Sequence, residues 1–225
     1  LNSTYNTKAQ AATLMMSKAG ALSHTPGTNW PCYTAAGDEA AGNSNLYLGR
    51  SGPDAISGYM RDPGSGNSAV GHRRWILLPQ TQQMGTGDIP SSSGYSPANA
   101  LWVFDSHTWD ARPATRNPFV AWPPAGDIPY PVVFARWSFA YPNADFTKAK
   151  VSLSKDNSPV SVTRYDTVNG YGDNTLVWII GGMSDGDAWP KPSSADTYTV
   201  SITGAIIGGK SQNFIYAVTI FDPNQ

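Results

Sequence analysis

Hydrophobic residues near the start of the chain recur at helical spacing. Ala9, Ala12, Met16 and Ala19 lie three or four positions apart and share one face of a helix. The small side chains on this face indicate close packing against a neighbouring layer. Gly20 follows the last of them, and glycine is the usual residue after a helix end. The pattern therefore predicts one tightly packed helix that ends at Gly20.

Further elements are predicted over the next eighty residues. Ser51–Asp54 contains a capping hydroxyl, a proline and an acid in the order typical of a helix start, and Asp62–Gly64 ends that helix. A short third helix is expected over Ser68–Arg73. Two strand-like segments follow, at Gln83–Gly87 and Ala100–Phe104.

The second half of the chain has a different pattern. Six prolines fall between positions 113 and 131, which predicts an extended linker. Beyond it, residues alternate between apolar and polar, most cleanly over Thr197–Thr203. The expected strands are Val132–Ser138, Ala149–Ser154, Pro159–Arg164, Thr175–Ile180, Thr197–Thr203 and Phe214–Phe221. We therefore predict an N-terminal domain over residues 1–112, a linker over 113–131 and an immunoglobulin-like β-sandwich over 132–225.

Composition narrows the function classes. The chain has 15 Lys and Arg against 16 Asp and Glu, a net charge of −1, so a nucleic-acid partner is not expected. No apolar run reaches the roughly 18 residues that span a bilayer. Many glycines and prolines, and acids that are nearly all Asp, favour a turn-rich protein. Cys32 is the one cysteine, so no internal disulfide is possible, and we expect a buried thiol.

Two histidines lie at predicted element boundaries, where side chains can face a cleft. His24 follows the first helix, and His72 lies at the third. Both can be structural residues that bond loop carbonyls, or they can converge on a metal or a substrate. Two imidazoles with one or two carboxylates suit zinc, and Glu39 and Asp62 are the candidate acids.

The loop at Gly182–Gly186 matches the G-x-S-x-G pattern of serine hydrolases. That motif must lead directly into a helix, and the proline-containing segment Asp187–Pro192 cannot form one. A serine hydrolase is therefore rejected. Asp185 and Asp187 in this loop are a weak calcium signal, because the rest of a calcium-loop pattern is missing.

Four stretches of the first half resemble the CAP family (cysteine-rich secretory proteins, antigen 5, pathogenesis-related 1), in its cysteine-poor bacterial branch. They are Ala9–Gly20 leading into Leu22-Ser23-His24; Asn43-Ser44-Asn45-Leu46; Asp54–Met60; and Gly71-His72-Arg73-Arg74-Trp75-Ile76-Leu77-Leu78-Pro79 followed by Gly85-Thr86-Gly87. The last stretch is the most specific. The resemblance covers roughly residues 5–104.

The resemblance implies a fold and a site. It implies an α+β protein whose N-terminal part is an α-β-α sandwich, here without the family's first helix. It places the family's two cleft histidines at His24 and His72, both possible zinc ligands. It places the second cleft acid at Asp62. The first acid is either replaced by Ser44, which would weaken a metal site, or supplied by Glu39.

The expected function is that of a secreted bacterial CAP protein. It would act mainly by binding a small molecule, a lipid, a glycan, a partner protein or a divalent metal in a cleft with His24 and His72. One alternative is a metal-dependent hydrolase in the same cleft, with Glu39 as general base. Another is a cell-wall or polysaccharide-binding protein that uses the aromatic residues and the C-terminal sandwich. Few charges, and a chain that starts at Leu1 and not at Met, favour an extracellular location without a signal peptide in this sequence.

Overall fold

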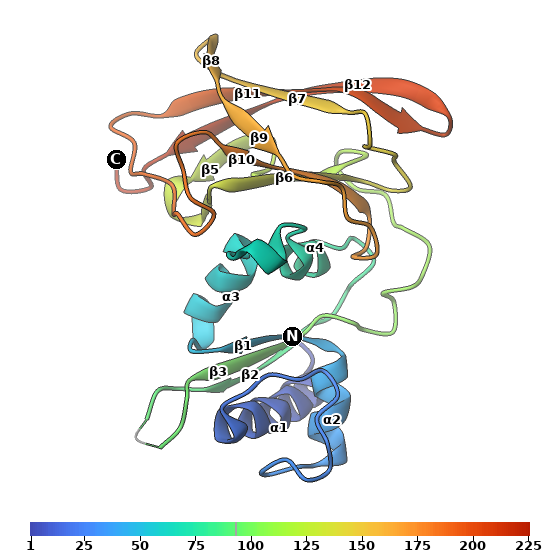
Figure 1. Ribbon diagram of the computed structural model, residues 1–225, viewed down its shortest axis with the longest axis vertical. Coiled ribbons are helices and arrows are strands. Elements are labelled where there is room, and N and C mark those ends of the chain that lie inside the picture. Colours follow the sequence, from blue (N-terminus) through green and yellow to red (C-terminus); the bar gives the residue numbers. More distant parts are fainter. Residues whose placement is uncertain (93) are drawn as a thin grey trace. The chain divides into compact units, whose positions relative to one another are not determined.

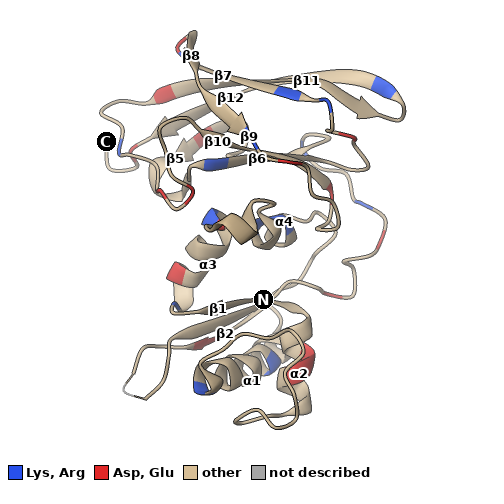
Figure 2. Ribbon diagram, in the orientation of Figure 1, with Lys and Arg blue, Asp and Glu red and all other residues tan. Residues whose placement is uncertain are grey.

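The computed structural model describes residues 1–92 and 94–225, and the protein is a mixture of helices and strands (Figure 1). The chain forms two compact units. Unit 1 consists of Leu1–Met60 and Leu78–Pro113, and unit 2 of Arg61–Leu77 and Ala114–Gln225. Unit 2 thus contains a short piece of the first half of the chain together with the whole second half. Charged residues are scattered thinly along both units (Figure 2).

Unit 1 is built on a three-stranded antiparallel sheet. The strands are β1 (Ser44–Leu48), β2 (Gly85–Ile89) and β3 (Ala98–Trp102), in the order β1-β3-β2. The helices are α1 (Ser3–Ala19), α2 (Ala35–Gly42) and α3 (Gly52–Arg61), whose last residue belongs to unit 2. The side chain of Asn2 accepts a hydrogen bond from the backbone N–H of Tyr5 at the start of α1. Gly20 ends α1 in the left-handed conformation that glycine adopts without strain, as the sequence predicts.

Helix α1 packs directly on β2, because two glycines leave room for its backbone. A Cβ atom on Gly87 would overlap backbone atoms of Ala9 and Gln10, and one on Gly85 would overlap Tyr5. The predicted Ala and Met face of α1 lies in the core of unit 1. The buried members of this core are Ala9, Ala12, Met16, Ala40, Ala41, Leu46, Ala100 and Trp102.

The other face of the sheet carries a polar network under α3. The hydroxyl of Tyr59 donates to Asn99 Oδ1 at 2.8 Å and lies 3.0 Å from the carbonyl oxygen of Asn45. The amide of Asn99 donates in turn to Thr86 Oγ1 and to Asp88 Oδ1, both at 2.9 Å. Because Tyr59 and Asn99 are buried, these hydrogen bonds replace the water that the two side chains lose on folding.

Unit 2 contains one α-helix, α4 (Gly71–Ile76), in the part of the chain that the structure describes, and two sheets. The four-stranded sheet has the order β4-β6-β10-β9, and the five-stranded sheet has the order β5-β12-β11-β7-β8. The strands are β4 (Val120–Trp122), β5 (Gly126–Pro129), β6 (Arg136–Tyr141), β7 (Lys150–Lys155), β8 (Ser158–Val160), β9 (Val162–Arg164), β10 (Asn174–Ile180), β11 (Asp196–Ile207) and β12 (Lys210–Phe221). Two 3₁₀ turns, Ser65–Asn67 and Tyr130–Val132, complete the unit.

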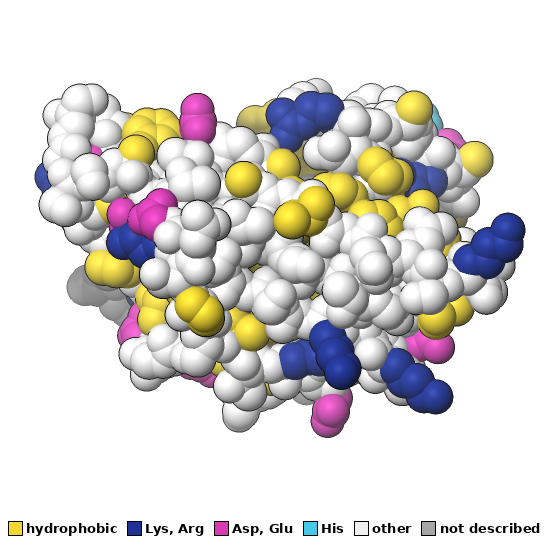
Figure 3. All heavy atoms as spheres, turned by 90° about the horizontal axis from the view of Figure 1, so that it is seen from above, with side chains coloured by type: hydrophobic (Ala, Val, Ile, Leu, Met, Phe, Trp, Pro, Cys, Tyr) yellow, Lys and Arg dark blue, Asp and Glu magenta, His cyan; other side chains and the backbone are white. Residues whose placement is uncertain are grey.

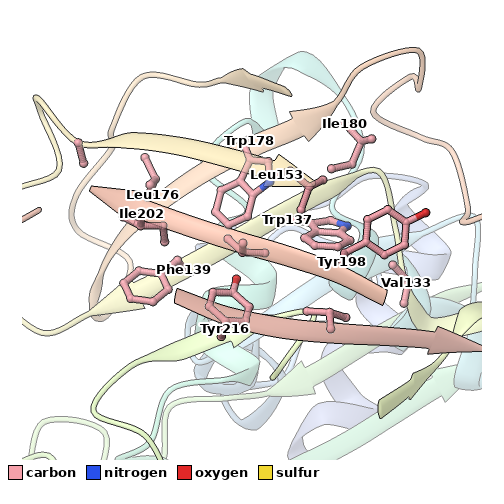
Figure 4. Packing of buried hydrophobic residues seen from close by; sticks show 14 of the residues in the cluster. Val133, Trp137, Phe139, Leu153, Leu176, Trp178, Ile180, Tyr198, Ile202 and Tyr216 are labelled. Atoms are coloured by element: carbon pink, nitrogen blue, oxygen red, sulfur yellow. The ribbon is translucent and has the colours of Figure 1, made fainter. Parts of the chain in front are cut away.

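The two sheets of unit 2 share one hydrophobic core, so they form a sandwich (Figure 4). Trp137 of β6 lies at its centre, with ring centroids 5.5 Å from Trp189 and 5.8 Å from Tyr198. Residues of β11 alternate as expected: Val200 and Ile202 are fully buried, and the threonines between Asp196 and Gly204 face outward. Viewed from above, the molecule presents a surface that is mainly uncharged (Figure 3).

Several elements differ from the sequence-based expectations. Helix α1 begins at Ser3, earlier than the apolar stripe suggests, because Asn2 caps it. Helix α2 and strand β1 are not predicted at all. Strands β4 and β5 lie within the range predicted as a linker, where they pair with β6 and β12.

The prediction that Cys32 is a buried thiol is wrong. Cys32 is exposed and lies in the turns between α1 and α2, with a backbone φ of 58°. Such a turn lies on the surface because its backbone groups need water as a partner. The aromatic neighbours Trp30 and Tyr33 in the sequence therefore do not enclose the thiol.

Candidate functional site

Two of the predicted site residues, Asp62 and His72, form a hydrogen-bonded pair in unit 2. The ring Nδ1 of His72 lies 2.8 Å from Asp62 Oδ1, and the backbone N–H of His72 donates to Asp62 Oδ2 at 3.0 Å. A carboxylate only accepts hydrogen bonds, so this contact places the ring proton on Nδ1. Nε2 then carries the lone pair of the ring, and it is the atom that can accept a hydrogen bond or bind a metal.

The backbone of Asp62, next to this contact, has a left-handed conformation. Asp62 follows directly after α3 and has a φ of 52°, in the left-handed region that Asp and Asn tolerate better than most residues. Its side chain is 1% exposed, whereas that of His72 is 33% exposed. The acid is therefore enclosed by protein, and the imidazole that it orients reaches the surface.

Next to His72, Arg73 is fully buried in unit 2. Its Nη1 donates to the carbonyl oxygen of Arg136 at 2.9 Å and to the hydroxyl of Ser138 at 3.2 Å. Burial lowers the pKa of the Arg73 guanidinium to about 9, while the nearby Asp62 carboxylate opposes that shift. At neutral pH the guanidinium is still charged, and it ties the start of α4 to strand β6.

His24 lies in unit 1, in the segment between α1 and α2. Its ring Nδ1 is 2.8 Å from the carbonyl oxygen of Ala41, in the last turn of α2. A carbonyl oxygen can only accept, so this nitrogen carries the proton and Nε2 is again the lone-pair nitrogen. His24 thus has the same tautomer as His72, but it is oriented by a backbone oxygen and not by an acid.

The two candidates for the first acid also lie in unit 1, in different surroundings. Glu39 is on the exposed side of α2, and both of its carboxylate oxygens are 2.7 Å from Lys8 Nζ of α1. Ser44 begins β1 and is buried at 4% exposure. Its hydroxyl has no hydrogen-bond partner among residues 1–92 and 94–225.

The ligating side chains of each unit can be compared with those that a zinc site needs. Protein zinc sites use three or four Cys, His, Asp or Glu ligands. Within the described part of either unit, no three such side chains form a group that could hold a metal. Asp62 and His72 supply a pair in unit 2, and His24 and Glu39 belong to unit 1. Neither unit by itself therefore fits a zinc ion.

The sequence analysis missed one residue that contacts this site. Arg136, the first residue of β6, donates to the carbonyl oxygen of Asp62 at 2.7 Å. It also pairs with Asp185 at 2.7 Å, so this acid of the Gly182–Gly186 loop is engaged by a guanidinium. The neighbouring Asp187 accepts a hydrogen bond from the backbone N–H of Ser184. No local pattern marks Arg136, because its partner Asp62 is 74 positions away in the sequence.

Comparison with known proteins identifies the first half of the chain. Residues 1–106 match the model of the cysteine-rich secretory protein family, CAP. The N-terminal part is therefore identified as a CAP domain, and the second half of the chain lies outside the match. A search of curated proteins finds no match.

PcoC, a methionine-rich copper resistance protein from Escherichia coli, is among the solved structures with a weak likeness to the chain, at a TM-score of 0.32 and 16% identity. The match covers 44% of the present chain and 92% of PcoC. A likeness of this size supports no conclusion about the fold or the function of the present chain.

No helix in the described part of the chain is both long and apolar enough to cross a membrane.

Proposed function

We propose that this CAP-domain protein acts by binding a ligand, and that His72, oriented by Asp62, is the main contact. The observation that carries the proposal is the pair of hydrogen bonds from His72 to the two oxygens of Asp62. A buried carboxylate that orients a partly exposed imidazole is a common arrangement behind metal-binding and ligand-binding histidines. The ligand would be a divalent metal or a molecule with a hydrogen-bond donor, such as a small molecule, a lipid headgroup, a glycan or a protein.

The metal form of the proposal is a zinc ion bound through Nε2 of His72, the lone-pair nitrogen of that ring. His24, in unit 1, has the same tautomer and is a separate candidate ligand. Ser44 in place of a first acid would weaken such a site.

The experiment measures zinc bound by the untagged full chain, by metal analysis and by titration. The variants are His72→Ala, the double variant His24→Ala/His72→Ala, and His107→Ala as a control. His107 is a matched control because its ring lies 3.3 Å from Asp105 and its side chain is 35% exposed, close to the 33% of His72. About one zinc per chain, lost in both His72 variants and kept in His107→Ala, would support the metal form. No binding at micromolar zinc would rule it out.

The organic-ligand form is tested separately on the same protein. Chemical shifts of the labelled His72 ring are followed while soluble glycans, peptidoglycan fragments or phospholipid vesicles are added. We expect one class to shift the His72 signals and to lose affinity in His72→Ala. If every class that binds leaves His72 unperturbed, the proposed contact is wrong.

Binding is favoured over hydrolysis by the surroundings of Glu39. A general base needs an available carboxylate oxygen, and both oxygens of Glu39 are engaged by Lys8. The polysaccharide-binding alternative depends on exposed aromatic rings. Trp137 and Trp178 are fully buried in the core of unit 2, and Trp109 of unit 1 is 77% exposed. Zinc-dependent hydrolysis that is abolished by Glu39→Gln would instead favour the hydrolase over a protein that only binds its ligand.

We also propose that unit 2 contains an immunoglobulin-like sandwich. In that fold, strands A, B, E and D form one sheet, and strands G, F and C form the other. Assigning β4, β6, β10 and β9 to A, B, E and D, and β12, β11 and β7 to G, F and C, reproduces both strand orders. The remaining strands, β5 and β8, extend the second sheet at its two edges.

A secreted, bacterial protein is the remaining part of the proposal. It is supported by the match of residues 1–106 to the cysteine-rich secretory protein family, and by the low share of charged residues. Fractionation of cells that express the full natural gene would test it. Protein found in the medium supports secretion, and protein confined to the cell interior contradicts it.

A further inference from the structure

Arg136 carries its charge into the interior of unit 2. It lies at the start of β6, and its side chain is 1% exposed. A buried guanidinium is costly unless its donors are all satisfied. Here it also lies over the ring of Tyr165, at 5.1 Å from the ring centroid. The guanidinium of Arg136 therefore needs defined partners inside unit 2.

Those partners come from the segment that contains Asp62. Nη1 donates to the carbonyl oxygens of Asp62 at 2.7 Å and Asn67 at 3.1 Å. Nη2 donates to the carbonyl oxygen of Gly64 at 2.9 Å and to Asp185 Oδ2 at 2.7 Å. Three backbone carbonyl oxygens of the turn at residues 62–67 thus accept hydrogen bonds from one planar guanidinium group. Lysine could not reproduce this, because its ammonium is one compact point charge.

The same turn positions the imidazole. Asp62 has a backbone held by Arg136 and a side chain that holds His72 through two hydrogen bonds. The helix that carries His72 is tied to the same strand, since Arg73 donates to the carbonyl oxygen of Arg136. Residues on both sides of the pair are therefore attached to β6, which lies outside the part of the chain that matches the CAP family.

We propose that Arg136 is a positioning residue for the Asp62–His72 pair, so that the second half of the chain is a working part of the ligand site. In this arrangement Arg136 touches no ligand. It fixes the left-handed backbone of Asp62, and Asp62 fixes the tautomer and direction of the His72 ring. The inference rests on the proposed function only in taking His72 as the ligand contact.

The test reads the His72 ring directly in the full chain without ligand. Nitrogen-15 shifts of labelled histidines report which ring nitrogen carries the proton. The wild type is expected to show His72 protonated on Nδ1. Arg136→Gln is expected to give a mixture of the two tautomers, and Arg136→Lys an intermediate result. A role in stability alone would lower the melting temperature without moving these shifts.

Arg164→Gln is the matched control. Arg164 belongs to the same unit and also donates to two backbone carbonyls, those of Thr147 at 3.1 Å and Ala149 at 3.0 Å. Neither belongs to the segment around Asp62, so the variant should lose stability and keep the wild-type His72 signals. A wild-type tautomer in Arg136→Gln, or an equal change in Arg164→Gln, would overturn the proposal.

Asp185→Asn keeps the test informative if Arg136→Gln does not fold. It removes the ionic partner of Nη2 and leaves the donation from Nη1 to Asp62 in place. A smaller change in the His72 signals than in Arg136→Lys is expected, and a larger one would contradict the assigned path through Asp62. The measurement needs no ligand. The tautomer of His72 can therefore still be determined in each variant if the proposed binding function proves wrong.

Discussion

His72 donates to both carboxylate oxygens of Asp62, one through its ring and one through its backbone N–H. The relationship couples a side chain to the start of a helix, because the backbone N–H of His72 is one of those that have no partner within α4. Asp62 therefore orients the imidazole and caps the helix at once. Asn99 has a comparable double role in unit 1, where it joins Tyr59 to β2.

Two substitutions of Asp62 distinguish the contribution of its carboxylate to stability from that of its backbone conformation. Asp62→Asn keeps a residue that tolerates the φ of 52°, but an amide nitrogen cannot accept the backbone N–H of His72. We expect the free energy of unfolding to fall by about 1–3 kcal/mol. Asp62→Ala should cost roughly 1 kcal/mol more, because alanine is strained in the left-handed region. Urea denaturation of both variants measures this, and equal losses would exclude the backbone effect.

The close contact of α1 with β2 predicts a second effect. Gly87→Ala would push a methyl group into the backbone of Ala9 and Gln10, which cannot move aside as a side chain can. We expect a loss of about 3 kcal/mol or more, at the upper end for overpacking. Gly66→Ala is the control, because a Cβ atom there has no neighbour within 4 Å. Thermal unfolding of both variants provides the comparison, and similar melting temperatures would show that α1 can shift.

Some of the fold and part of the site could be predicted from local pattern. The apolar face of α1, its end at Gly20 and the alternation in β11 follow from spacing alone, because each depends on residues close in the sequence. Asp62 and His72 were candidates from their residue types and their positions at element boundaries, and the resemblance to a family then gave both a role in a cleft. The structure brings these two together, while His24, Glu39 and Ser44 lie in unit 1. The larger site therefore stays a prediction.

The missed features share a physical cause. Helix α2 has the sequence AAGDEAAG, whose small residues give little contrast between buried and exposed faces. The role of Arg136 depends on a contact over 74 positions, which leaves no trace in local composition. Prolines between positions 113 and 131 suggested an extended linker. An extended chain can also pair at a sheet edge, as β4 and β5 do.

Asp105 should make the stability of unit 1 depend on acidic pH. Burial alone would raise the pKa of this carboxyl, but hydrogen bonds from the backbone N–H groups of Gln82, Gln83 and His107 outweigh burial and lower its pKa. A lowered pKa means that the carboxylate stabilises the fold above about pH 4, the ordinary value. That contribution is lost as the pH falls through the folded-state pKa.

Asp105→Asn tests this pH dependence. We expect the variant to be less stable than the wild type by about 1–3 kcal/mol at pH 6, because an amide nitrogen cannot accept these donors. The difference should shrink as the pH falls below about 4, because the unfolded wild type then takes up a proton on this carboxyl before the folded protein does. Denaturant titrations from pH 3 to pH 7 measure it, with the exposed Asp110→Asn as control. A difference that stays constant with pH would contradict the role of the charge.

Two buried tyrosines should respond in opposite ways to loss of the hydroxyl. Burial raises the pKa of both Tyr59 and Tyr216 above the ordinary value. The hydroxyl of Tyr59 donates to Asn99 Oδ1, so Tyr59→Phe leaves a buried amide oxygen without that donor and should cost about 1–3 kcal/mol. The hydroxyl of Tyr216 has no hydrogen-bond partner in the described part of the chain.

Tyr216→Phe should therefore leave the stability of unit 2 unchanged or raise it by up to about 2 kcal/mol, because folding no longer strips water from an unpartnered hydroxyl. The ring of Tyr216 packs 5.5 Å from Phe119 by ring centroids, and phenylalanine keeps this packing. Unfolding monitored by tryptophan fluorescence and by circular dichroism measures both variants. A loss of more than about 1 kcal/mol in Tyr216→Phe would mean that the hydroxyl has a partner, such as a buried water, that stabilises the core.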